Sequence, residues 1–361
     1  MVKLAIVMGT RPEIIKLSPI IKNLRRSEFI EIFTGQHYDY GLGLRFIEDL
    51  GLPKPDIKMK LKMLHGPGAK SIQISEMIQR LGKAFSQTRP DAVIIQGDTD
   101  TVLAGSIASL KSKIPICHVE SGLRSFDWRM PEEHNRIVAD HVSDLLFAPT
   151  SLAKKNLTSE SVHGRIFVTG NTIIDAIEEN IKLAERKSTI SLEDENFVLV
   201  TIHRAENICN TSVFRGLVKA LLEPKTKFVF PIHPHTLKNL HLFGLYDKVK
   251  SAKNITLLKT IGYFDMLSLM KSCQFIVTDS GGLQEEATSP RIRKKVLVVR
   301  KTTDRPEAVK LGFSELLGTK PNDVKKAITK NTEDSSIPTR NSPYGDGNSS
   351  RSIIKLIHKY I

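Results

Sequence analysis

Short, uninterrupted apolar runs alternate with amphipathic segments along this chain, and this pattern limits its fold more than any other feature. Strands that are apolar on both faces occur in parallel sheets, where crossover helices cover both sides. In the first half, the runs that we expect to be strands are Val2–Met8, Phe29–Thr34, Asp91–Ile95, Ile114–Val119 and Asp144–Ala148. The segments with helical spacing are Pro12–Leu24, Gly41–Leu50, a longer stretch near Ser71–Phe85, and Val102–Leu110. The first half therefore predicts an α/β domain.

The second half of the chain repeats this design. Its expected strands are Phe197–Ile202, Lys227–Pro231, Ile255–Leu258, Phe275–Thr278 and Val296–Val299. A chain of 361 residues is also long for a single hydrophobic core. We therefore predict an α/β protein with two doubly wound, Rossmann-like domains that face a cleft.

We expect the two domains to join near Gly170–Thr172, before a helix at Ile173–Ala184. The first domain would comprise residues 1–170 and the second residues 171–347, with a C-terminal helix over residues 348–361 joining the first domain. The segment Asn331–Ser350 is rich in Ser, Pro, Asn and Gly, which predicts a long loop before the last helix at Ile353–Tyr360.

The charge balance of the chain is basic. Lys and Arg number 53 against 39 Asp and Glu, which gives a formal net charge of +14. These charges are scattered, and no alternation of aromatic and basic residues of the kind that stacks bases is visible. We therefore expect no nucleic acid partner, and the basic balance suits an enzyme that attracts a diphosphate.

The remaining composition points to a reduced cytoplasmic enzyme. No apolar run is long enough to span a bilayer, so we expect no membrane insertion. Glycine and charged residues at Gly9–Glu13 interrupt any signal peptide. The cysteines Cys117, Cys209 and Cys273 match no metal spacing, and their odd number argues against a disulfide framework.

Polar motifs follow the predicted strands, at the edge where open parallel sheets bind ligands. In the first half these motifs are GTRPE at residues 9–13, GDTDT at 97–101 and ESGLRS at 120–125. In the second half they are HRAEN at 203–207, HPH at 233–235 and DSGG at 279–282. The sequence thus predicts one functional edge on each sheet.

The DSGG motif has the form of a phosphate site. Ser280, Gly281 and Gly282 connect a strand to a helix, and the unpaired amides at a helix start attract phosphate. Glu286 follows inside the helix, where it could accept hydrogen bonds from a ribose diol. The alternative is an ordinary strand–helix turn with a cap. Arg11 and Lys16, at the start of the first helix, could hold phosphate or sugar oxygens, or could form a solvated basic helix start.

Three carboxylates, Asp98, Glu120 and Glu132, are expected at the functional edge of the first domain. Removing a proton from carbon and returning it requires a general base and a general acid, which carboxylates in different environments supply. The alternative for each is a salt bridge with a neighbouring arginine. The neighbouring arginines are Arg124, Arg129 and Arg136.

Two histidines, His203 and His233, end neighbouring strands of the second domain. Neither has zinc spacing with a cysteine or a carboxylate, so we expect no metal. The dinucleotide fingerprint GxGxxG is absent after the first strand, which argues against a redox cofactor.

These motifs together resemble the non-hydrolysing UDP-N-acetylglucosamine 2-epimerases. The matching segments are GTRPEIIKLSPI (9–20), TGQH (34–37), GDTDTVLAG (97–105), HVESGLRS (118–125), MPEEHNR (130–136), VTGNTIIDA (168–176), VTIHRAEN (200–207), DSGGLQEEA (279–287), RPEAV (305–309) and PYGDG (343–347). They occur in order along nearly the whole chain. The forms QHYDY and SFDWRMPEE are most similar to archaeal-type members.

The resemblance implies a fold like that of two-domain nucleotide-sugar glycosyltransferases, usually homodimeric, and a reaction without metal or NAD. A proton is removed at carbon 2 as UDP is lost, which leaves a 2-acetamidoglucal. Protonation on the opposite face and return of UDP then give the manno epimer. Carried over by motif, the catalytic residues would be Asp98, Glu120, Glu132 and His203. The substrate-binding residues would be Arg11, Lys16, Arg136, His233, Ile261, Met266, Ser280, Gly281, Gly282, Glu286 and Arg305.

Two departures from the family pattern stand out. Members of the family can hold a second UDP-sugar as an activator beside the Gln-His pair, here Gln36 and His37, but Tyr38–Tyr40 follow it in this chain. The segment Thr288–Lys295 is longer and more basic than the usual loop.

Four alternatives stay open at the level of sequence. They are a 2-epimerase of a UDP-diacetamido-hexuronate, a hydrolysing epimerase that releases N-acetylmannosamine, a glycosyltransferase, and a UDP-sugar sensor without catalytic activity. The GTRPE and GNTIIDA forms favour the simpler sugar, and a transferase has no need for three carboxylates around carbon 2.

Overall fold

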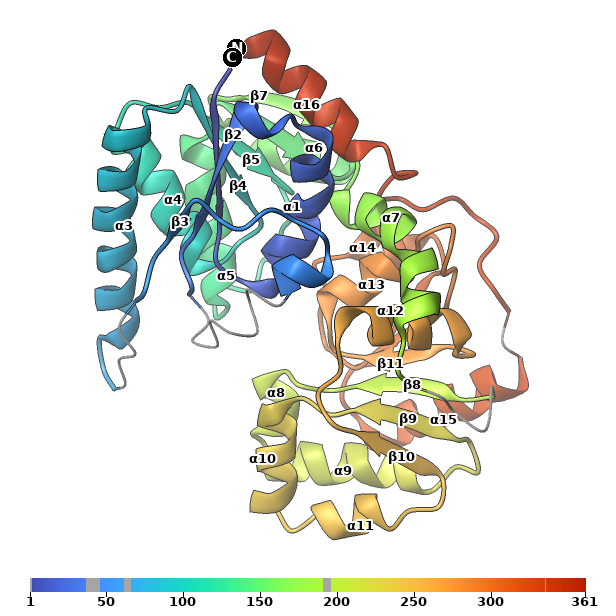
Figure 1. Cartoon of the computed structure of the whole chain (residues 1–361). Coiled ribbons are helices and arrows are strands. Elements are labelled where there is room, and N and C mark those ends of the chain that lie inside the picture. The colour runs from blue at the N-terminus through green and yellow to red at the C-terminus, as the bar shows by residue number, and fades with distance from the viewer. Residues whose placement is uncertain (1, 37–45, 62–65, 191–195, 335) are drawn as a thin grey trace. The chain divides into compact units, whose positions relative to one another are not determined.

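The computed structural model describes the chain except residues 1, 37–45, 62–65, 191–195 and 335. It consists of two compact units (Figure 1). Unit 1 comprises Met1–Ala176 and Tyr344–Ile361, and unit 2 comprises Ile177–Pro343. The chain passes between the units at two places, and each boundary lies a few residues from that of the predicted domains 1–170 and 171–347.

Unit 1 is built on a seven-stranded sheet in the order β3-β2-β1-β4-β5-β6-β7, and its neighbouring strands pair in parallel. The strands are β1 (Leu4–Met8), β2 (Phe29–Phe33), β3 (Ile57–Lys58), β4 (Ala92–Gln96), β5 (Ile116–Val119), β6 (Leu145–Ala148) and β7 (Arg165–Val168). Every residue of β1, β4, β5 and β6 is buried, as expected for strands covered on both faces.

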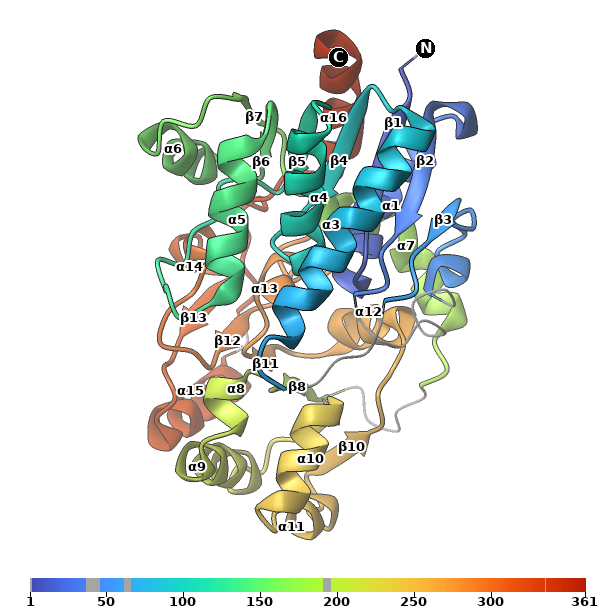
Figure 2. The ribbon, with the colours of Figure 1, turned by 90° about the vertical axis from the view of Figure 1, so that its left-hand side faces the viewer.

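Helices cover both faces of this sheet. They are α1 (Arg11–Asn23), α3 (Ala69–Thr88), α4 (Asp100–Lys111), α5 (Pro131–Val142), α6 (Ser151–Ser159), the first part of α7 (Thr172–Lys187) and α16 (Ser349–Tyr360), with a 3-10 turn at Arg26–Glu28. Figures 1 and 2 show α3, α4 and α5 on one face, and α1 and α16 packed together on the other. The C-terminal helix therefore belongs to the first unit.

Unit 2 has a six-stranded parallel sheet in the order β10-β9-β8-β11-β12-β13. The strands are β8 (Val198–Thr201), β9 (Phe228–Pro231), β10 (Ile255–Leu258), β11 (Ile276–Thr278), β12 (Val296–Val298) and β13 (Ser314–Leu316). The helices are α8 (Ala205–Ile208), α9 (Thr211–Leu222), α10 (Pro234–Leu242), α11 (Tyr246–Lys250), α12 (Tyr263–Ser272), α13 (Gly281–Glu286), α14 (Pro306–Lys310) and α15 (Pro321–Glu333). Buried phenylalanines such as Phe214, Phe228 and Phe275 fill its core.

The two strand orders confirm the predicted α/β class with two Rossmann-like sheets. In each sheet the chain first adds strands on one side of the first strand and then adds the remaining strands on the other side of that strand. The topological switch points lie between β1 and β4 in unit 1 and between β8 and β11 in unit 2. Ligands bind at the carboxyl ends of the strands at such points.

The structure also corrects the predicted elements. Sequence analysis missed β3, β7 and β13, because β3 has two residues and the other two strands are only partly buried. The predicted loop Asn331–Ser350 is wrong at both ends, since α15 continues to Glu333 and α16 begins at Ser349. The first half of the predicted helix Gly41–Leu50 lies outside the described residues. In the described part of the chain, no helix has the length and apolarity that crossing a membrane requires.

Candidate active site

A buried carboxylate, that of Glu13, links the two loops at the switch point of unit 1. Glu13, on the first turn of α1, accepts hydrogen bonds from the amides of Gly9 (2.8 Å) and Thr10 (2.6 Å). Its other oxygen accepts from the Thr99 hydroxyl at 2.6 Å. Gly9 and Thr10 follow β1 and Thr99 follows β4, so Glu13 joins the two loops that border the switch point. It thereby fixes the backbone next to Asp98.

Burial raises the pKa of Glu13 to about 7, against the opposing effect of these hydrogen bonds. Sequence analysis quoted Glu13 within the GTRPE motif but gave it no role. The signal was present, because a threonine followed three residues later by glutamate forms a capping box.

Asp98 follows β4 and lies against the cation Arg136 of α5. Arg136 forms ion pairs with Asp98 and with Glu133, the latter at 2.7 Å. The Asn135 side chain donates to the backbone oxygen of Asp98 at 3.0 Å. Arg136 is buried, whereas the Asp98 side chain remains 28% exposed and is therefore accessible to a ligand. The structure thus brings together two predicted site residues, with the arginine behind the carboxylate.

Glu120 directly follows β5 in a strained conformation. Its φ of 68° lies in the left-handed region, which costs a residue other than glycine about 1 kcal/mol or more. The buried Lys16 ammonium forms an ion pair with Oε2 of Glu120, and the Asn171 side chain donates to the same oxygen at 2.8 Å. The structure therefore places Lys16, predicted to contact phosphate or sugar, against a predicted catalytic carboxylate.

The two adjacent glutamates at the start of α5 differ in their surroundings. Glu133 is buried and accepts hydrogen bonds from the amides of Ser125 (3.0 Å) and Phe126 (2.9 Å). It therefore holds the loop between β5 and α5 in place, a role that sequence analysis missed. Glu132, the predicted catalytic residue, is half-buried beside it.

Two other predicted residues of unit 1, Arg11 and Gln36, lie within the described part of the chain. Arg11 is exposed at the start of α1, and its guanidinium carbon lies 4.7 Å from the centre of the Phe46 ring. Gln36 accepts hydrogen bonds from the amide and the hydroxyl of Thr101, each at 2.8 Å, so its side chain helps to hold α4. His37 and Tyr38–Tyr40 lie outside the described residues.

Two of the arginines weighed as partners of the carboxylates have other partners. Arg124 is buried and paired with Asp140 (2.7 Å) and Glu160 (2.6 Å). Arg129 is exposed and paired with Asp127 at 2.7 Å. The salt-bridge alternative therefore applies to Asp98 through Arg136 and, unexpectedly, to Glu120 through a lysine.

A second buried carboxylate fastens the switch point of unit 2. Asp279, after β11, accepts hydrogen bonds from the amides of His203 (3.0 Å) and Arg204 (2.9 Å), which follow β8. The Asn207 side chain donates to it at 2.9 Å, and Nδ1 of His203 lies 3.1 Å away. Burial would raise the pKa of Asp279, but the hydrogen bonds and charge of His203 outweigh it, so the pKa lies below its ordinary value.

His203 is the histidine that this carboxylate orients. With Nδ1 directed at Asp279, Nε2 is left to face a ligand, and the side chain is 37% exposed. The ring of His233 lies 5.4 Å from that of His203, which brings the two predicted histidines together. Nδ1 of His233 accepts from the amide of His235 at 3.3 Å and caps α10.

The glycines of the DSGG motif open α13. Neither Gly281 nor Gly282 has a positive φ. A Cβ added at Gly281 would meet Asp304 at 3.5 Å, and one at Gly282 would meet Glu286 at 3.7 Å, which are ordinary contacts. The protein's own packing therefore does not require glycine here, and the space above the helix start suits the close approach of a phosphate. Glu286 is the last residue of α13 rather than an interior one.

Arg305 lies next to this helix start. It is buried and forms ion pairs with Glu285 and with Asp304, the latter at 2.7 Å. A Cβ added at Gly281 would lie 4.0 Å from the Arg305 guanidinium carbon. Ile261 and Met266, predicted to contact uracil, are half-buried, Ile261 before α12 and Met266 within it.

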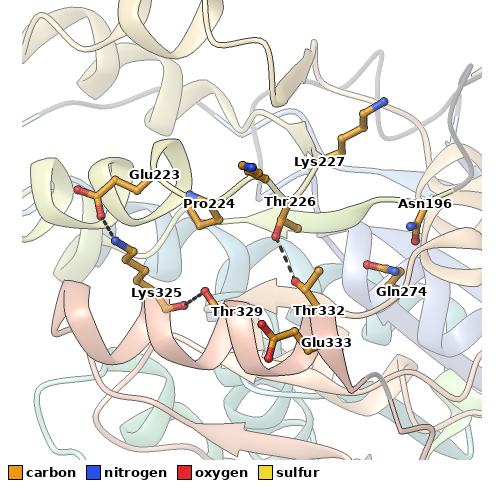
Figure 3. Close-up of a pocket in the computed structure, with 11 residues that line it drawn as sticks. Asn196, Glu223, Pro224, Thr226, Lys227, Gln274, Lys325, Thr329, Thr332 and Glu333 are labelled. Carbon is orange, nitrogen blue, oxygen red and sulfur yellow. Dashed lines mark hydrogen bonds and ion pairs between the residues drawn. The ribbon is translucent and has the colours of Figure 1, made fainter.

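A pocket of unit 2 lies at the other edge of the same sheet. It has a volume of about 650 Å³ and lies between residues just before β8, β9 and β11 and the helix α15 (Figure 3). Its polar side chains are partly paired with one another, Lys325 with Glu223 and Thr226 with Thr332. The candidate residues lie at the carboxyl ends of the strands, so this pocket is not part of the candidate site.

The structure also bears on metal binding and on the basic segment. In the part of the chain that the structure describes, no group of three His, Cys, Asp or Glu could hold a metal ion. Within Thr288–Lys295, Arg291 pairs with Glu178 at 2.9 Å and Lys295 with Glu315 at 3.2 Å. Part of the basic charge of this segment is therefore compensated inside unit 2.

Comparisons with known proteins were made for the whole chain. A family model described as UDP-N-acetylglucosamine 2-epimerase matches residues 21–358. A UDP-N-acetylglucosamine 2-epimerase from Methanocaldococcus jannaschii is 40% identical to the chain, over 98% of each protein. A crystal structure of the M. jannaschii enzyme in complex with UDP-GlcNAc and UDP has a TM-score of 0.87 at 38% identity and covers 99% of both chains.

A relative with a different substrate is also similar. A UDP-2,3-diacetamido-2,3-dideoxy-D-glucuronate 2-epimerase from Pseudomonas aeruginosa is 32% identical, over 99% of each protein. The relatives therefore share carbon-2 epimerisation in their names and differ in the sugar.

Proposed function

The chain belongs to the UDP-N-acetylglucosamine 2-epimerase family, and we propose that it reversibly converts UDP-N-acetylglucosamine to UDP-N-acetylmannosamine. The observation that carries this proposal is the pair of carboxylates beside the switch point of unit 1. Asp98 and Glu120 each end a strand, and each is backed by a buried cation, Arg136 or Lys16. A reaction that removes and restores a proton on carbon needs such groups.

Unit 1 supplies the acid–base chemistry in this proposal. One carboxylate removes the proton from carbon 2 while the bond between carbon 1 and the UDP oxygen breaks, which leaves 2-acetamidoglucal and UDP. A carboxylic acid then protonates carbon 2 on the other face, and a UDP oxygen rejoins carbon 1. Asp98, Glu120 and Glu132 are the candidates, without assignment to a face. The electron pair that leaves with UDP returns with it, so the overall change consumes no oxidant or reductant.

Unit 2 supplies the nucleotide site in this proposal. The helix start at Ser280–Gly282 and the nearby Arg305 favour a diphosphate, because amides and guanidinium groups donate to phosphate oxygens. Glu286 is the candidate for the ribose hydroxyls, and His203, oriented by Asp279, for the leaving oxygen. Since hexose and diphosphate belong to one molecule, the proposal requires both sets of residues to act on it together.

The test is proton exchange at carbon 2. The purified chain is incubated with UDP-N-acetylglucosamine in heavy water, and the sugar is followed by NMR. We expect deuterium at carbon 2 in both epimers, with both sugars still linked to UDP. Free N-acetylmannosamine would indicate a hydrolysing enzyme, and no exchange would indicate a transferase, a sensor or another sugar.

The diacetamido-hexuronate is the second candidate substrate, because a relative at 32% identity is named for it. The same experiment with that UDP-sugar separates the two. The simpler sugar is supported by the higher identity, 40%, to the M. jannaschii enzyme. Faster exchange into the hexuronate would reverse this assignment.

We further infer that the chain acts in the cytoplasm as a homodimer and supplies a precursor of cell-surface polysaccharide or glycoprotein. Support for the location comes from the nucleotide-linked substrate and the unpaired cysteines Cys117, Cys209 and Cys273. Family resemblance supports the dimer. Light scattering of the purified protein at micromolar concentration tests the dimer, and a mass of one chain would contradict it.

A further inference from the structure

His118 is a fully buried histidine on β5, and both of its ring nitrogens meet hydrogen-bond acceptors. Nε2 lies 2.8 Å from the carbonyl oxygen of Gly97, and Nδ1 lies 2.8 Å from Oδ1 of Asp140. A carbonyl oxygen can only accept, so Nε2 carries a proton. The protonation of Nδ1 then depends on the state of Asp140.

Asp140 has the surroundings of an ionised carboxylate. Its Oδ2 accepts from the Arg124 guanidinium at 2.7 Å and from the amide of Gly122 at 3.1 Å. Since an ionised carboxylate also only accepts, Nδ1 of His118 carries a proton as well.

The charges around His118 balance when the ring is an imidazolium. Arg124 pairs with Asp140 and also with Glu160, whose Oε1 lies 2.7 Å from Arg124 Nε. We name His118, Arg124, Asp140 and Glu160 the ion cluster; the first three side chains are buried, and that of Glu160 is 26% exposed. With His118 doubly protonated, the cluster holds two cations and two anions.

The cluster holds the backbone beside two candidate catalytic residues. Gly97, whose carbonyl accepts from His118, directly precedes Asp98. Gly122, whose amide donates to Asp140, lies two residues after Glu120. Both glycines have a positive φ, 85° for Gly97 and 80° for Gly122. Their loops therefore have a backbone conformation that few other residues adopt, and the hydrogen bonds to the cluster hold it in place.

We propose that His118, with both ring nitrogens donating hydrogen bonds, positions Asp98 and Glu120 for proton transfer at carbon 2. His118 has no exposed surface, so it is a positioning residue and acts through the Gly97 carbonyl and Asp140. This proposal rests on the proposed epimerase function for its catalytic consequence. The protonation state itself can be tested without any activity.

The protonation state is read directly in the wild-type protein. Selective nitrogen-15 labelling of histidine and NMR at about pH 7.5 report the protons on each ring nitrogen. We expect one histidine with both ring nitrogens protonated. A spectrum in which every histidine lacks one ring proton would overturn the proposal.

The positioning role is tested with His118→Gln and a matched control, His163→Gln. His163 is an exposed histidine of the same unit whose Nδ1 contacts the backbone oxygen of His141. A glutamine at 118 presents its amide nitrogen to one acceptor and its oxygen to the other, so one loop is released. We expect His118→Gln to lower kcat for carbon-2 exchange at least about tenfold while KM changes less than about threefold. The control should match wild type.

A merely structural role gives a different result. His118→Gln would then lower the melting temperature, yet its folded fraction would turn over with the wild-type kcat. That outcome would overturn the positioning role. If wild type itself shows no exchange with either UDP-sugar, the proposed function fails while the protonation test still stands.

A charge-restoring pair keeps the proposal testable if His118→Gln does not fold. Asp140→Asn alone leaves two cations against one carboxylate, and His118→Gln alone leaves two carboxylates against one cation. The double variant His118→Gln/Asp140→Asn holds one charge of each sign. We expect its melting temperature to exceed that of at least one single variant, a non-additive recovery. If the two losses simply add, His118 does not carry the proposed charge.

Discussion

Glu120 shows at the level of one residue what sequence could and could not predict. Its position after a strand, in a motif with other polar residues, was enough to mark it as a candidate catalyst. Its partners Lys16 and Asn171 come from distant parts of the chain, and no local spacing signals an ion pair across 104 positions. Its φ of 68° was equally hidden, because only the fold shows that a glutamate adopts a glycine-like conformation.

Asp98 provides the first prediction at this scale. Asp98→Asn preserves the shape of the side chain and removes its ability to take up a proton. We expect carbon-2 exchange to fall at least about 100-fold, since general acid–base groups contribute this much. UDP binding, measured by calorimetry, should remain, because the nucleotide groups are in unit 2. Loss of UDP binding together with exchange would make Asp98 a structural residue.

Glu31 provides a prediction about stability and pH. Its carboxylate lies on β2 with no exposed surface, and among the described residues neither oxygen has a hydrogen-bond partner. Burial raises its pKa from 4.5 to about 7, with the charge of Arg26 opposing this and that of Asp56 adding to it. As pH rises, the folded protein therefore keeps the proton on Glu31 up to a higher pH than the unfolded chain does. The contribution of Glu31 to the unfolding free energy is therefore greatest below about pH 4.5 and falls as pH rises to about 7.

Glu31→Gln removes this titration. We expect the loss of unfolding free energy between about pH 5 and about pH 8 to be smaller in the variant by roughly 2 kcal/mol. Urea unfolding at each pH measures this difference, and Glu48→Gln, at an exposed position, serves as the control. Equal pH slopes for wild type and Glu31→Gln would contradict the prediction.

At the scale of secondary-structure elements, the two units use the same device. Each switch point has one buried carboxylate that joins the loops after the two bordering strands, Glu13 in unit 1 and Asp279 in unit 2. The strands and helices themselves were predictable, because apolar runs and helical spacing are local. The fastening carboxylates were not, because their bonds connect loops that meet only in the folded sheet. Sequence analysis accordingly quoted both residues in motifs without giving either a role.

Gly122 provides the prediction for this scale. A Cβ there would lie 2.4 Å from the backbone oxygen of Ala153 on α6, and the φ of 80° disfavours any other residue. Gly122→Ala should therefore destabilise unit 1 by about 3 kcal/mol or more, the sum of strain and overpacking.

Gly51→Ala is the matched control. Gly51 has a similar φ of 69°, but a Cβ there would meet nothing within 4 Å. We expect it to cost only about 1 kcal/mol, the strain alone. Urea unfolding compares the two variants. Equal losses would mean that α6 or the loop after β5 shifts to accommodate the added methyl group at little cost in free energy.

At the scale of the whole molecule, the class, the two sheets and the return of the last helix to unit 1 were predictable, because repeated strand–helix alternation and length decide them. The exact limits of the units depend on which side chains pack together. Tyr344, for example, is fully buried in unit 1, although it lies in a segment predicted to be a long loop of the second domain.

The division of labour between the units yields the last prediction, which hydrogen exchange with mass spectrometry can test. UDP should slow exchange in unit 2 at Ile202–Ile208 and Asp279–Glu286, because ligand binding stabilises the segments that it contacts. UDP-N-acetylglucosamine should in addition slow exchange in unit 1 at Gly97–Thr101 and Val119–Ser125, because the proposed function assigns the sugar, and not the nucleotide, to the carboxylates. Equal protection of these unit 1 segments by both ligands would show that the nucleotide alone orders them. In that case the protection around Asp98 and Glu120 would not be evidence that the hexose binds there.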